Sequence, residues 1–135
     1  MKLYHGTSEA NLKSIVEEGY IRFLSSAKNS NAEIAGLTGF GVGDVGQISF
    51  ADNKVDALYF GALSALASKM RGEQKTLSFR VLQLDKDAVE EKGIVIYPLN
   101  TLKDKEWFAG SEWIAFRQDI PVDLIEEVHN VDRSL

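Results

Sequence analysis

The alternation of hydrophobic and polar positions predicts a chain built mostly of short strands, with two helices in its first half. A period of two indicates strands, and apolar residues recurring every three or four positions indicate helices. We expect one helix ahead of Gly19, a second over residues 54–69 and a helical turn over residues 121–125. The expected strands span residues 1–5, 20–24, 47–51, 77–84, 94–97, 112–116 and 126–131.

Residues suited to helix ends mark the limits of the two helices. Thr7 or Ser8 caps the first helix, and Gly19 ends it, because glycine readily adopts the left-handed conformation found at helix C-termini. Asp52 is the expected cap of the second helix, and Gly72 its end. The second helix carries an apolar stripe at helical spacing, typical of a side that faces the core: Tyr59, Leu63, Leu66 and Met70.

The order of these elements favours an α+β fold. The two main helices come early, among the first strands, and most of the remaining structure is strand. Strands in this order are expected to form two small β-sheets packed together, a split β-sandwich. A chain of 135 residues without an internal repeat fits a single compact domain. We therefore expect one domain over residues 1–135.

Residues 25–46 differ in kind from the rest of the chain. They are rich in glycine, serine and asparagine and carry few charges. A long loop inside a compact domain is usually a functional lid or a disordered tract. The run lacks the lysine followed by serine or threonine that ends a phosphate-cradling P-loop. We expect a glycine-rich lid over this segment.

Composition excludes several kinds of chemistry. The chain contains no cysteine, which excludes a disulfide framework, a zinc–thiolate site and a thiol nucleophile. The two histidines, His5 and His129, lie near opposite ends, so no histidine pair has the spacing of metal ligands and no metal is expected. A net charge of −5 argues against non-specific nucleic-acid binding, which depends on lysine and arginine.

No apolar run reaches the length of a signal sequence or a membrane span. We therefore expect no membrane contact and a cytoplasmic location, whether the protein belongs to a cell or to something that infects it.

His5 is the first candidate for chemistry. It ends the first expected strand, directly before an expected tight turn at Gly6 and Thr7 that leads into a helix. Glycine in such a turn lets a ligand approach the backbone closely, and amides at a helix N-terminus attract anions. The alternative is a structural histidine with ordinary hydrogen bonds, beside an ordinary helix cap.

Glu112 and Tyr59 are the other candidates. Glu112 begins an apolar strand and shares a face with Ile114 and Phe116. A carboxylate on an apolar face is rare unless it has a partner or a task, although a position at the strand's edge would also explain it. Tyr59 lies in the apolar stripe of the second helix, where it is either a core residue or an aromatic ring that stacks on a ligand.

In combination these residues resemble the ADP-ribosyltransferase superfamily, in its diphtheria-toxin-like (His-Tyr-Glu) branch. That branch includes the poly-ADP-ribose polymerases and DarT-type toxins. Three segments, spread over the full length of the chain, carry the resemblance: Tyr4-His5-Gly6-Thr7 continuing to Gly19; Ile48-Ser49-Phe50-Ala51-Asp52 with Ala57-Leu58-Tyr59; and Glu112-Trp113-Ile114-Ala115-Phe116 with Ile120, Leu124 and Ile125.

The resemblance implies NAD as the substrate and a role for each matching residue. His5 is expected to hydrogen-bond a ribose hydroxyl of NAD. The main chain of Gly6 is expected to hold the nicotinamide carboxamide, with Thr7 supporting the turn. Tyr59 is expected to stack on the nicotinamide ring. Glu112 matches the catalytic glutamate, which binds the 2′-hydroxyl of the nicotinamide ribose and stabilises an oxocarbenium-like transition state.

Two positions depart from the pattern of the branch. Ser49 falls where the motif has a tyrosine, so one side of the nicotinamide site is thinner or is supplied by Phe50 or by Phe40 of the expected lid. Asp56 falls where the polymerases carry a serine that donates to the carboxamide oxygen. An ionised carboxylate can only accept hydrogen bonds, so Asp56 either accepts from the amide nitrogen or faces solvent.

The activity that the resemblance implies is the transfer of a single ADP-ribose to a macromolecular acceptor, a protein or a nucleic-acid base. Compact members of the superfamily are often bacterial or phage effectors, or toxins paired with an antitoxin or inhibitor protein. Two alternatives stay open. One is an RNA 2′-phosphotransferase, which shares the fold and the His-Gly-Thr opening but needs several arginines to hold phosphates. The other is a module that binds NAD without catalysis.

Overall fold

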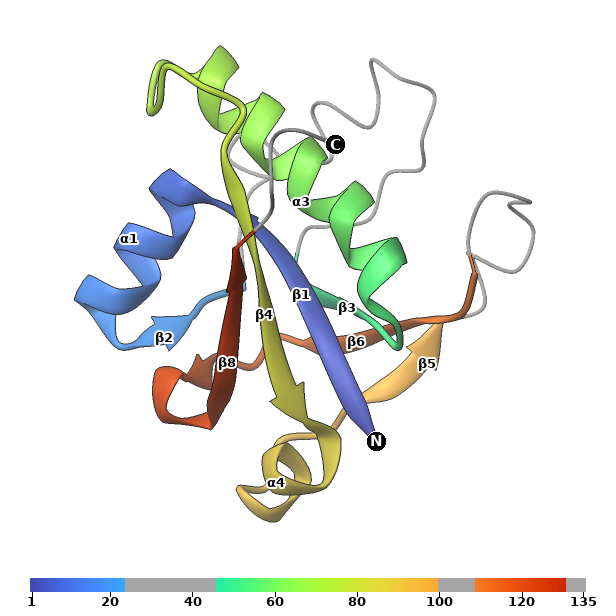
Figure 1. Cartoon of the computed structure of the whole chain (residues 1–135). Helices are drawn as coiled ribbons and strands as arrows, with labels where there is room; N and C mark the ends of the chain where they lie inside the picture. Colours follow the sequence, from blue (N-terminus) through green and yellow to red (C-terminus); the bar gives the residue numbers. More distant parts are fainter. Residues whose placement is uncertain (24–45, 100–108, 131–135) are drawn as a thin grey trace.

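The computed structural model describes residues 1–23, 46–99 and 109–130. Within them the chain folds into a six-stranded sheet, a two-stranded sheet and a small number of helices (Figure 1). In chain order the elements are β1 (Lys2–Ser8), α1 (Glu9–Glu18), β2 (Tyr20–Ile21), β3 (Gln47–Ala51), α3 (Lys54–Met70), β4 (Phe79–Asp85), α4 (Lys86–Glu91), β5 (Tyr97–Leu99), β6 (Glu112–Phe116), β7 (Ile120–Pro121), the 3₁₀ turn η3 (Val122–Leu124) and β8 (Ile125–Asn130). The expected α+β class is confirmed.

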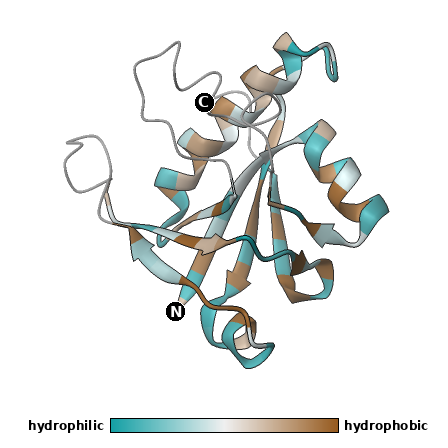
Figure 2. Cartoon of the chain, turned by 180° about the vertical axis from the view of Figure 1, so that it is seen from behind, coloured by the Kyte–Doolittle hydropathy of each residue, from teal (hydrophilic) through white to brown (hydrophobic). Residues whose placement is uncertain are grey.

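Strand β1 lies near the middle of the larger sheet, whose order is β5-β6-β3-β1-β4-β8. It pairs with β4 along its whole length, from Lys2 opposite Asp85 to Ser8 opposite Phe79. The smaller sheet joins β2 to β7. The described pairings are antiparallel. Hydrophobic and hydrophilic residues alternate along the strands of the larger sheet (Figure 2). Because successive side chains point to opposite faces, the two faces of the sheet can differ in what packs against them.

The two faces of the larger sheet pack against different partners. One face carries Leu3, Phe50 and Leu82, which cluster with Ile15 of α1 and Ile120 of β7. The other face is covered by α3, which runs along β1 and β4 (Figure 1). Ala57 of α3 forms a second buried cluster with Ala51 and Val81 of the sheet. The residues that pack against this cluster are Tyr4, Leu58, Phe60 and Phe79.

The side of α3 that meets the sheet consists of small residues. They are Ala57, Gly61, Ser64, Ala65 and Ser68. The expectation that the large apolar stripe faces the core is wrong for Tyr59 and Met70, which are exposed, whereas Leu63 and Leu66 are half-buried. A helix packed this closely on a strand leaves room only for short side chains, and periodicity alone does not say which of two stripes is buried.

Gly6 shows how close this packing is. A Cβ atom on Gly6 would lie 2.2 Å from the carbonyl oxygen of Ala57 and 2.4 Å from the nitrogen of Gly61. Both atoms belong to the α3 backbone, which cannot rotate away as a side chain can. Gly6 therefore lets the helix approach β1. It also lies within the strand, so the expected turn at Gly6 and Thr7 is wrong: β1 continues to Ser8.

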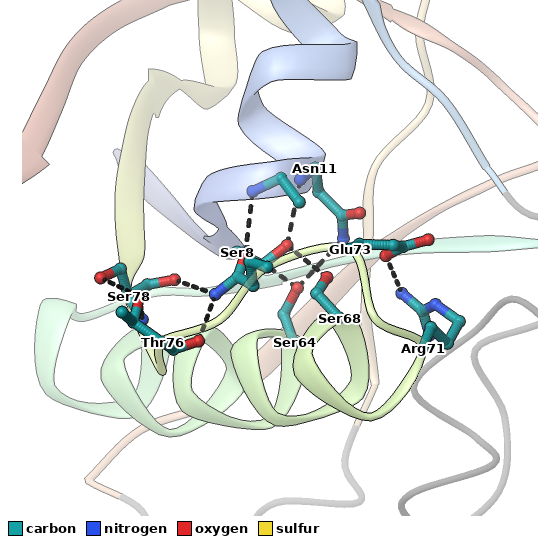
Figure 3. A network of polar contacts seen from close by, with 10 residues as sticks. Ser8, Asn11, Ser64, Ser68, Arg71, Glu73, Thr76 and Ser78 are labelled. Atoms are coloured by element: carbon teal, nitrogen blue, oxygen red, sulfur yellow. Dashed lines mark hydrogen bonds and ion pairs between the residues drawn. The ribbon is translucent and has the colours of Figure 1, made fainter.

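A buried polar network joins the start of α1 to α3 (Figure 3). Ser8, one of the two alternatives expected for the cap, accepts a hydrogen bond from the Asn11 amide at 3.0 Å. Its own amide donates to the Ser64 hydroxyl at 2.9 Å, and its hydroxyl lies 2.7 Å from that of Ser68. The Asn11 side chain also donates to Ser64. Because these groups are shielded from water, their hydrogen bonds fix how α1 meets α3.

Replacing Ser8 by Ala is expected to lower the free energy of unfolding by about 1–2 kcal/mol. The variant loses the helix cap and leaves the buried Ser68 hydroxyl without its Ser8 partner. Urea denaturation followed by circular dichroism measures the change. Ser14→Ala, at an exposed position on the same helix, is the matched control and is expected to change stability by less than about 0.5 kcal/mol. Equal stability of the two variants would contradict the role of the network.

Several expected elements shift in the structure. Strand β4 begins at Phe79 and not at residue 77, and β2 ends at Ile21. Pro98 does not stop a strand over 94–97 but lies inside β5. That strand is an edge of the larger sheet, where a missing N–H is tolerated. Asn53 caps α3 in place of Asp52, because its side-chain oxygen accepts from the Asp56 amide.

Helix α4 is not predicted by the sequence, where Asp85 and Asp87 look like turn residues. Its exposed positions are charged, and Val89 is the residue that it buries. Two adjacent apolar residues, Ala88 and Val89, give no helical periodicity. Among the described residues, no helix is both long and apolar enough to cross a membrane. Residues 25–45 of the lid expected over residues 25–46, Phe40 among them, lie outside the described residues.

Candidate active site

Strands β1 and β3 separate after a single paired position. In the described part of the chain, Tyr4 opposite Ala51 is the one position that joins them. Continuing that register would set Gly6 opposite Ser49. Instead, the His5 ring lies beside Phe50 with 5.7 Å between ring centroids, and its Nδ1 lies 2.8 Å from the Ser49 carbonyl oxygen. The Ser49 carbonyl oxygen thus contacts the His5 imidazole at the point where β1 and β3 separate.

This contact fixes the tautomer of His5. A carbonyl oxygen can only accept, so Nδ1 carries the proton and donates to Ser49. Burial lowers the pKa of His5 and outweighs the Ser49 hydrogen bond, which acts in the opposite direction. The ring is therefore neutral near pH 7, and Nε2 is an acceptor. A neutral Nε2 is suited to accept a hydrogen bond from a hydroxyl group.

The main chain of Gly6 points into the same gap between the strands. Hydrogen bonds from Lys86 to Met1 and from Glu9 to Ser78 flank the β1–β4 ladder. In an antiparallel ladder, the main-chain N–H and C=O groups of successive residues point alternately toward and away from the partner strand. The odd-numbered residues of β1 therefore turn toward β4, and Gly6 turns its N–H and C=O toward β3. Beside the separated strands, these two groups can meet a flat polar group such as an amide.

Glu112 begins β6 and lies at the end of the gap where β1 and β3 are still paired. It is paired with Ala51, which is in turn paired with Tyr4. Its side chain is 9% exposed. By alternation, it leaves the sheet on the face covered by α3, whereas His5 leaves on the opposite face. A molecule that meets both groups must lie across the point where β1 and β3 separate.

The chain is similar to a known protein in its structure. No family model matches the sequence, and no curated protein matches it significantly. The structure of Thermus sp. 2.9 DarT in complex with carba-NAD⁺ is similar, with a TM-score of 0.59 and 18% sequence identity. The similarity covers 98% of this chain and 83% of that one. The fold is DarT-like.

The remaining expected site residues take different positions in this DarT-like fold. Phe50 is fully buried, so its ring supports His5 from the core. Thr7 is also buried, within β1 opposite Arg80. The observed contact of Ser49 with His5 uses its carbonyl oxygen, which any residue at that position could supply. A serine at this position is therefore compatible with this contact.

Tyr59 lies on α3 with 36% of its surface exposed. It is two residues beyond Ala57, which is about 200° around the helix, and so points away from β1. It lies one turn from Asp56, which contacts the segment leading into β6. Tyr59 is thus on the side of the helix nearest to the start of the Glu112 strand, and the reading as a core residue is wrong.

Asp56 does not face solvent, which was one of the two expectations for it. It is 2% exposed, and its carboxylate accepts from the amides of Ala109 and Gly110 and from the side chain of Asn53. Such contacts could not be expected from the sequence, because two of the donors are main-chain groups more than fifty residues away. Among the described residues, no group of three or more potential ligands is arranged to hold a metal.

The neutral state of His5 predicts a pH dependence of stability. Its pKa is lower in the folded protein than the value of about 6.5 expected when unfolded. Below that pH the unfolded chain binds a proton that the folded protein does not. Stability therefore falls as pH decreases, by up to about 1.4 kcal/mol per pH unit from this group.

Urea denaturation at about pH 7.5 and about pH 5.5 checks this expectation in the protein and in His5→Asn. The variant lacks the titrating group but keeps all others, including His129, so the difference between the two proteins isolates His5. The unchanged protein should lose more stability on acidification. The same loss in both proteins would contradict a neutral His5 in the folded protein.

Proposed function

We propose that this chain is a NAD-dependent ADP-ribosyltransferase that transfers a single ADP-ribose to a macromolecular acceptor. The observation that carries the proposal is the separation of β1 from β3 at His5 and Gly6, with Glu112 in the adjoining row. The likeness of the fold to a DarT in complex with carba-NAD⁺ supports the same substrate. The order of the three motif segments supports it independently.

The groups around the gap match the polar groups of NAD. Nε2 of His5 accepts a hydrogen bond from a ribose hydroxyl, which its fixed tautomer allows. The Gly6 N–H donates to the carboxamide oxygen of nicotinamide, and the Gly6 carbonyl accepts from the carboxamide nitrogen. Tyr59 provides an aromatic surface for the nicotinamide ring, on the side of α3 near the start of β6. Ser49 leaves more room there than the tyrosine of the motif.

Glu112 is the catalytic residue of the proposal. The bond between the anomeric carbon and the nicotinamide nitrogen breaks, and its electron pair leaves with nicotinamide. Positive charge develops on the ribose, and a nearby carboxylate stabilises it, as in glycoside hydrolysis. A lone pair of the acceptor then forms the new bond to the anomeric carbon, and the acceptor loses a proton. Glu112 accepts a hydrogen bond from the 2′-hydroxyl and so keeps the ribose oriented.

The described arginines favour this reaction over an RNA 2′-phosphotransferase. That activity needs several arginines that converge on phosphates. Of the four described arginines, Arg22 pairs with Glu18, Arg71 with Glu73 and Arg80 with Glu9, whereas Arg117 lies over the Phe116 ring. The three pairs involve different elements of the fold. With a net charge of −5, the balance favours a protein acceptor over a nucleic acid, although a single base needs only a small basic groove.

Incubation with NAD labelled in the adenylate portion tests the proposal. Parallel reactions contain cell extract, DNA or RNA, and free nicotinamide is measured in each. We expect label on an acceptor together with release of nicotinamide, and the labelled fraction identifies the acceptor class. Binding of NAD without release of nicotinamide would instead support a non-catalytic module. Release without a labelled acceptor would indicate a NAD hydrolase.

By analogy with compact members of the superfamily, we also propose a bacterial or phage effector or toxin, with an antitoxin or inhibitor protein as a partner. Slower growth of cells that express the active protein, and normal growth with a Glu112 variant, would support this role.

A further inference from the structure

A short segment before Glu112 is held by two carboxylates. The amides of Ala109 and Gly110 donate to the two oxygens of Asp56, each at 2.9 Å. The amide of Ser111 donates to Asp52 at 3.1 Å. Three successive main-chain N–H groups are thus gathered by acidic side chains at the start of α3, and the next residue is Glu112. We call residues 109–111 the entry segment.

The fit of the entry segment is close. A Cβ atom on Gly110 would lie 2.1 Å from Oδ1 of Asp52 and 2.7 Å from Nδ2 of Asn53. The Asp52 amide also donates to the Ser111 carbonyl at 3.2 Å, which extends the ladder between β3 and β6 beyond Ala51 and Glu112. The entry segment is therefore held by the carboxylates of Asp56 and Asp52, by the Asp52 main chain and by close packing at Gly110.

The chemistry of Asp56 suits this task. Its carboxylate accepts three hydrogen bonds, from the two amides and from Asn53 at 2.7 Å, which a single hydroxyl could not match. Hydrogen bonds to an ionised group are stronger than those between neutral groups, and they offset the cost of burying the charge. The Asp56 amide is itself held by Asn53, which anchors the carboxylate to the first turn of α3.

We infer that Asp56 is a positioning residue for Glu112: its buried carboxylate holds the entry segment and thereby sets where β6, and the glutamate that begins it, stand relative to α3. The inference rests on the proposed function for its catalytic consequence. It explains why an acidic residue occupies the position where the polymerases have a serine that contacts the carboxamide. Asp56 uses its oxygens on the protein itself and acts on the reaction through Glu112.

Asp56→Asn tests the inference with little change in shape. The amide oxygen keeps one acceptor, but the NH₂ group faces a main-chain N–H, so at least one amide of the entry segment loses its partner. We expect kcat for nicotinamide release to fall by about tenfold to a hundredfold, with KM for NAD within about threefold of the original value. Ser64→Ala is the matched control, because it also removes two hydrogen bonds from a buried polar group of α3. It is expected to leave kcat unchanged.

Amide hydrogen exchange, measured by NMR, provides a second readout that does not depend on activity. Protection of the Ala109 and Gly110 amides should fall by at least about tenfold in Asp56→Asn and stay unchanged in Ser64→Ala. A raised KM with unchanged kcat would overturn the inference, since it would show that Asp56 binds NAD directly. Unchanged exchange would overturn it as well.

The two readouts separate this inference from the proposed function. If the unsubstituted protein releases no nicotinamide, the proposed function fails and the catalytic part of the inference falls with it. Loss of amide protection in Asp56→Asn would then still establish that Asp56 holds the entry segment. If the unsubstituted protein is active and Asp56→Asn has full kcat, the proposed function stands and the positioning role is overturned.

Discussion

Glu112→Gln is expected to slow nicotinamide release and ADP-ribose transfer by about a hundredfold or more. The amide keeps the size of the side chain but removes the negative charge that stabilises the developing positive charge on the ribose. Because Gln can still hydrogen-bond a hydroxyl, the affinity for NAD should change much less than kcat. Single-turnover measurement of nicotinamide release and calorimetry with NAD separate the two effects.

Two controls accompany this measurement. The thermal unfolding midpoint of Glu112→Gln should stay close to that of the unsubstituted protein, which shows that lost activity is not lost structure. Glu91→Gln makes the same chemical change at an exposed position of α4 and should be fully active. If Glu112→Gln labels the acceptor as fast as the original protein, Glu112 is not the catalytic residue.

Gly6→Ala is expected to lower the free energy of unfolding by about 3 kcal/mol, the upper end of what overpacking usually costs. The added Cβ would lie 2.2 Å from the Ala57 carbonyl oxygen. Relief requires the whole of α3 to move away from β1. The same movement would shift Asp56 and Tyr59 relative to the gap between β1 and β3, so activity should fall together with stability. Urea denaturation and the nicotinamide assay measure the two effects.

Gly61→Ala is the comparison variant, because it adds the same atom on the other side of this contact. Its Cβ would lie 2.2 Å from a ring atom of Phe79, which is a side chain that can rotate. Alanine also favours a helix over glycine by up to about 1 kcal/mol. We therefore expect a loss of about 1 kcal/mol or less. Similar losses in the two variants would contradict the view that the backbone of α3 sets the limit at Gly6.

The parts of the fold that depend on local sequence could be predicted. Ser8 and Gly19 delimit α1 as expected, since a cap and a left-handed glycine act on neighbouring residues. The bounds of β3 and β6 also follow from the sequence. The sequence does not show which side of α3 is buried, because the distance to β1 decides between the stripe of small residues and the stripe of large ones. The same distance explains Gly6: the sequence predicts a turn there, whereas the glycine permits close packing of α3 on β1.

Sequence alone reaches the candidate site only in part. His5, Gly6 and Glu112 were found by their order along the chain and by resemblance to a family. The hydrogen bond from His5 to the Ser49 carbonyl could not be found, because a main-chain acceptor has no sequence signal. The same holds for Asp56, whose amide partners lie in a distant segment. Contacts of side chains with remote backbone are set by tertiary structure.

The contact between His5 and Ser49 has a consequence for how this protein can change. The carbonyl oxygen that orients the imidazole belongs to the backbone, so a mutation can replace residue 49 without removing that acceptor. A substitution at position 49 can thus change the side chain there without changing the orientation of His5. A position of this kind can drift in evolution, and under the proposed function it is the position to vary in libraries that adapt the protein to NAD analogues with bulkier nicotinamide groups.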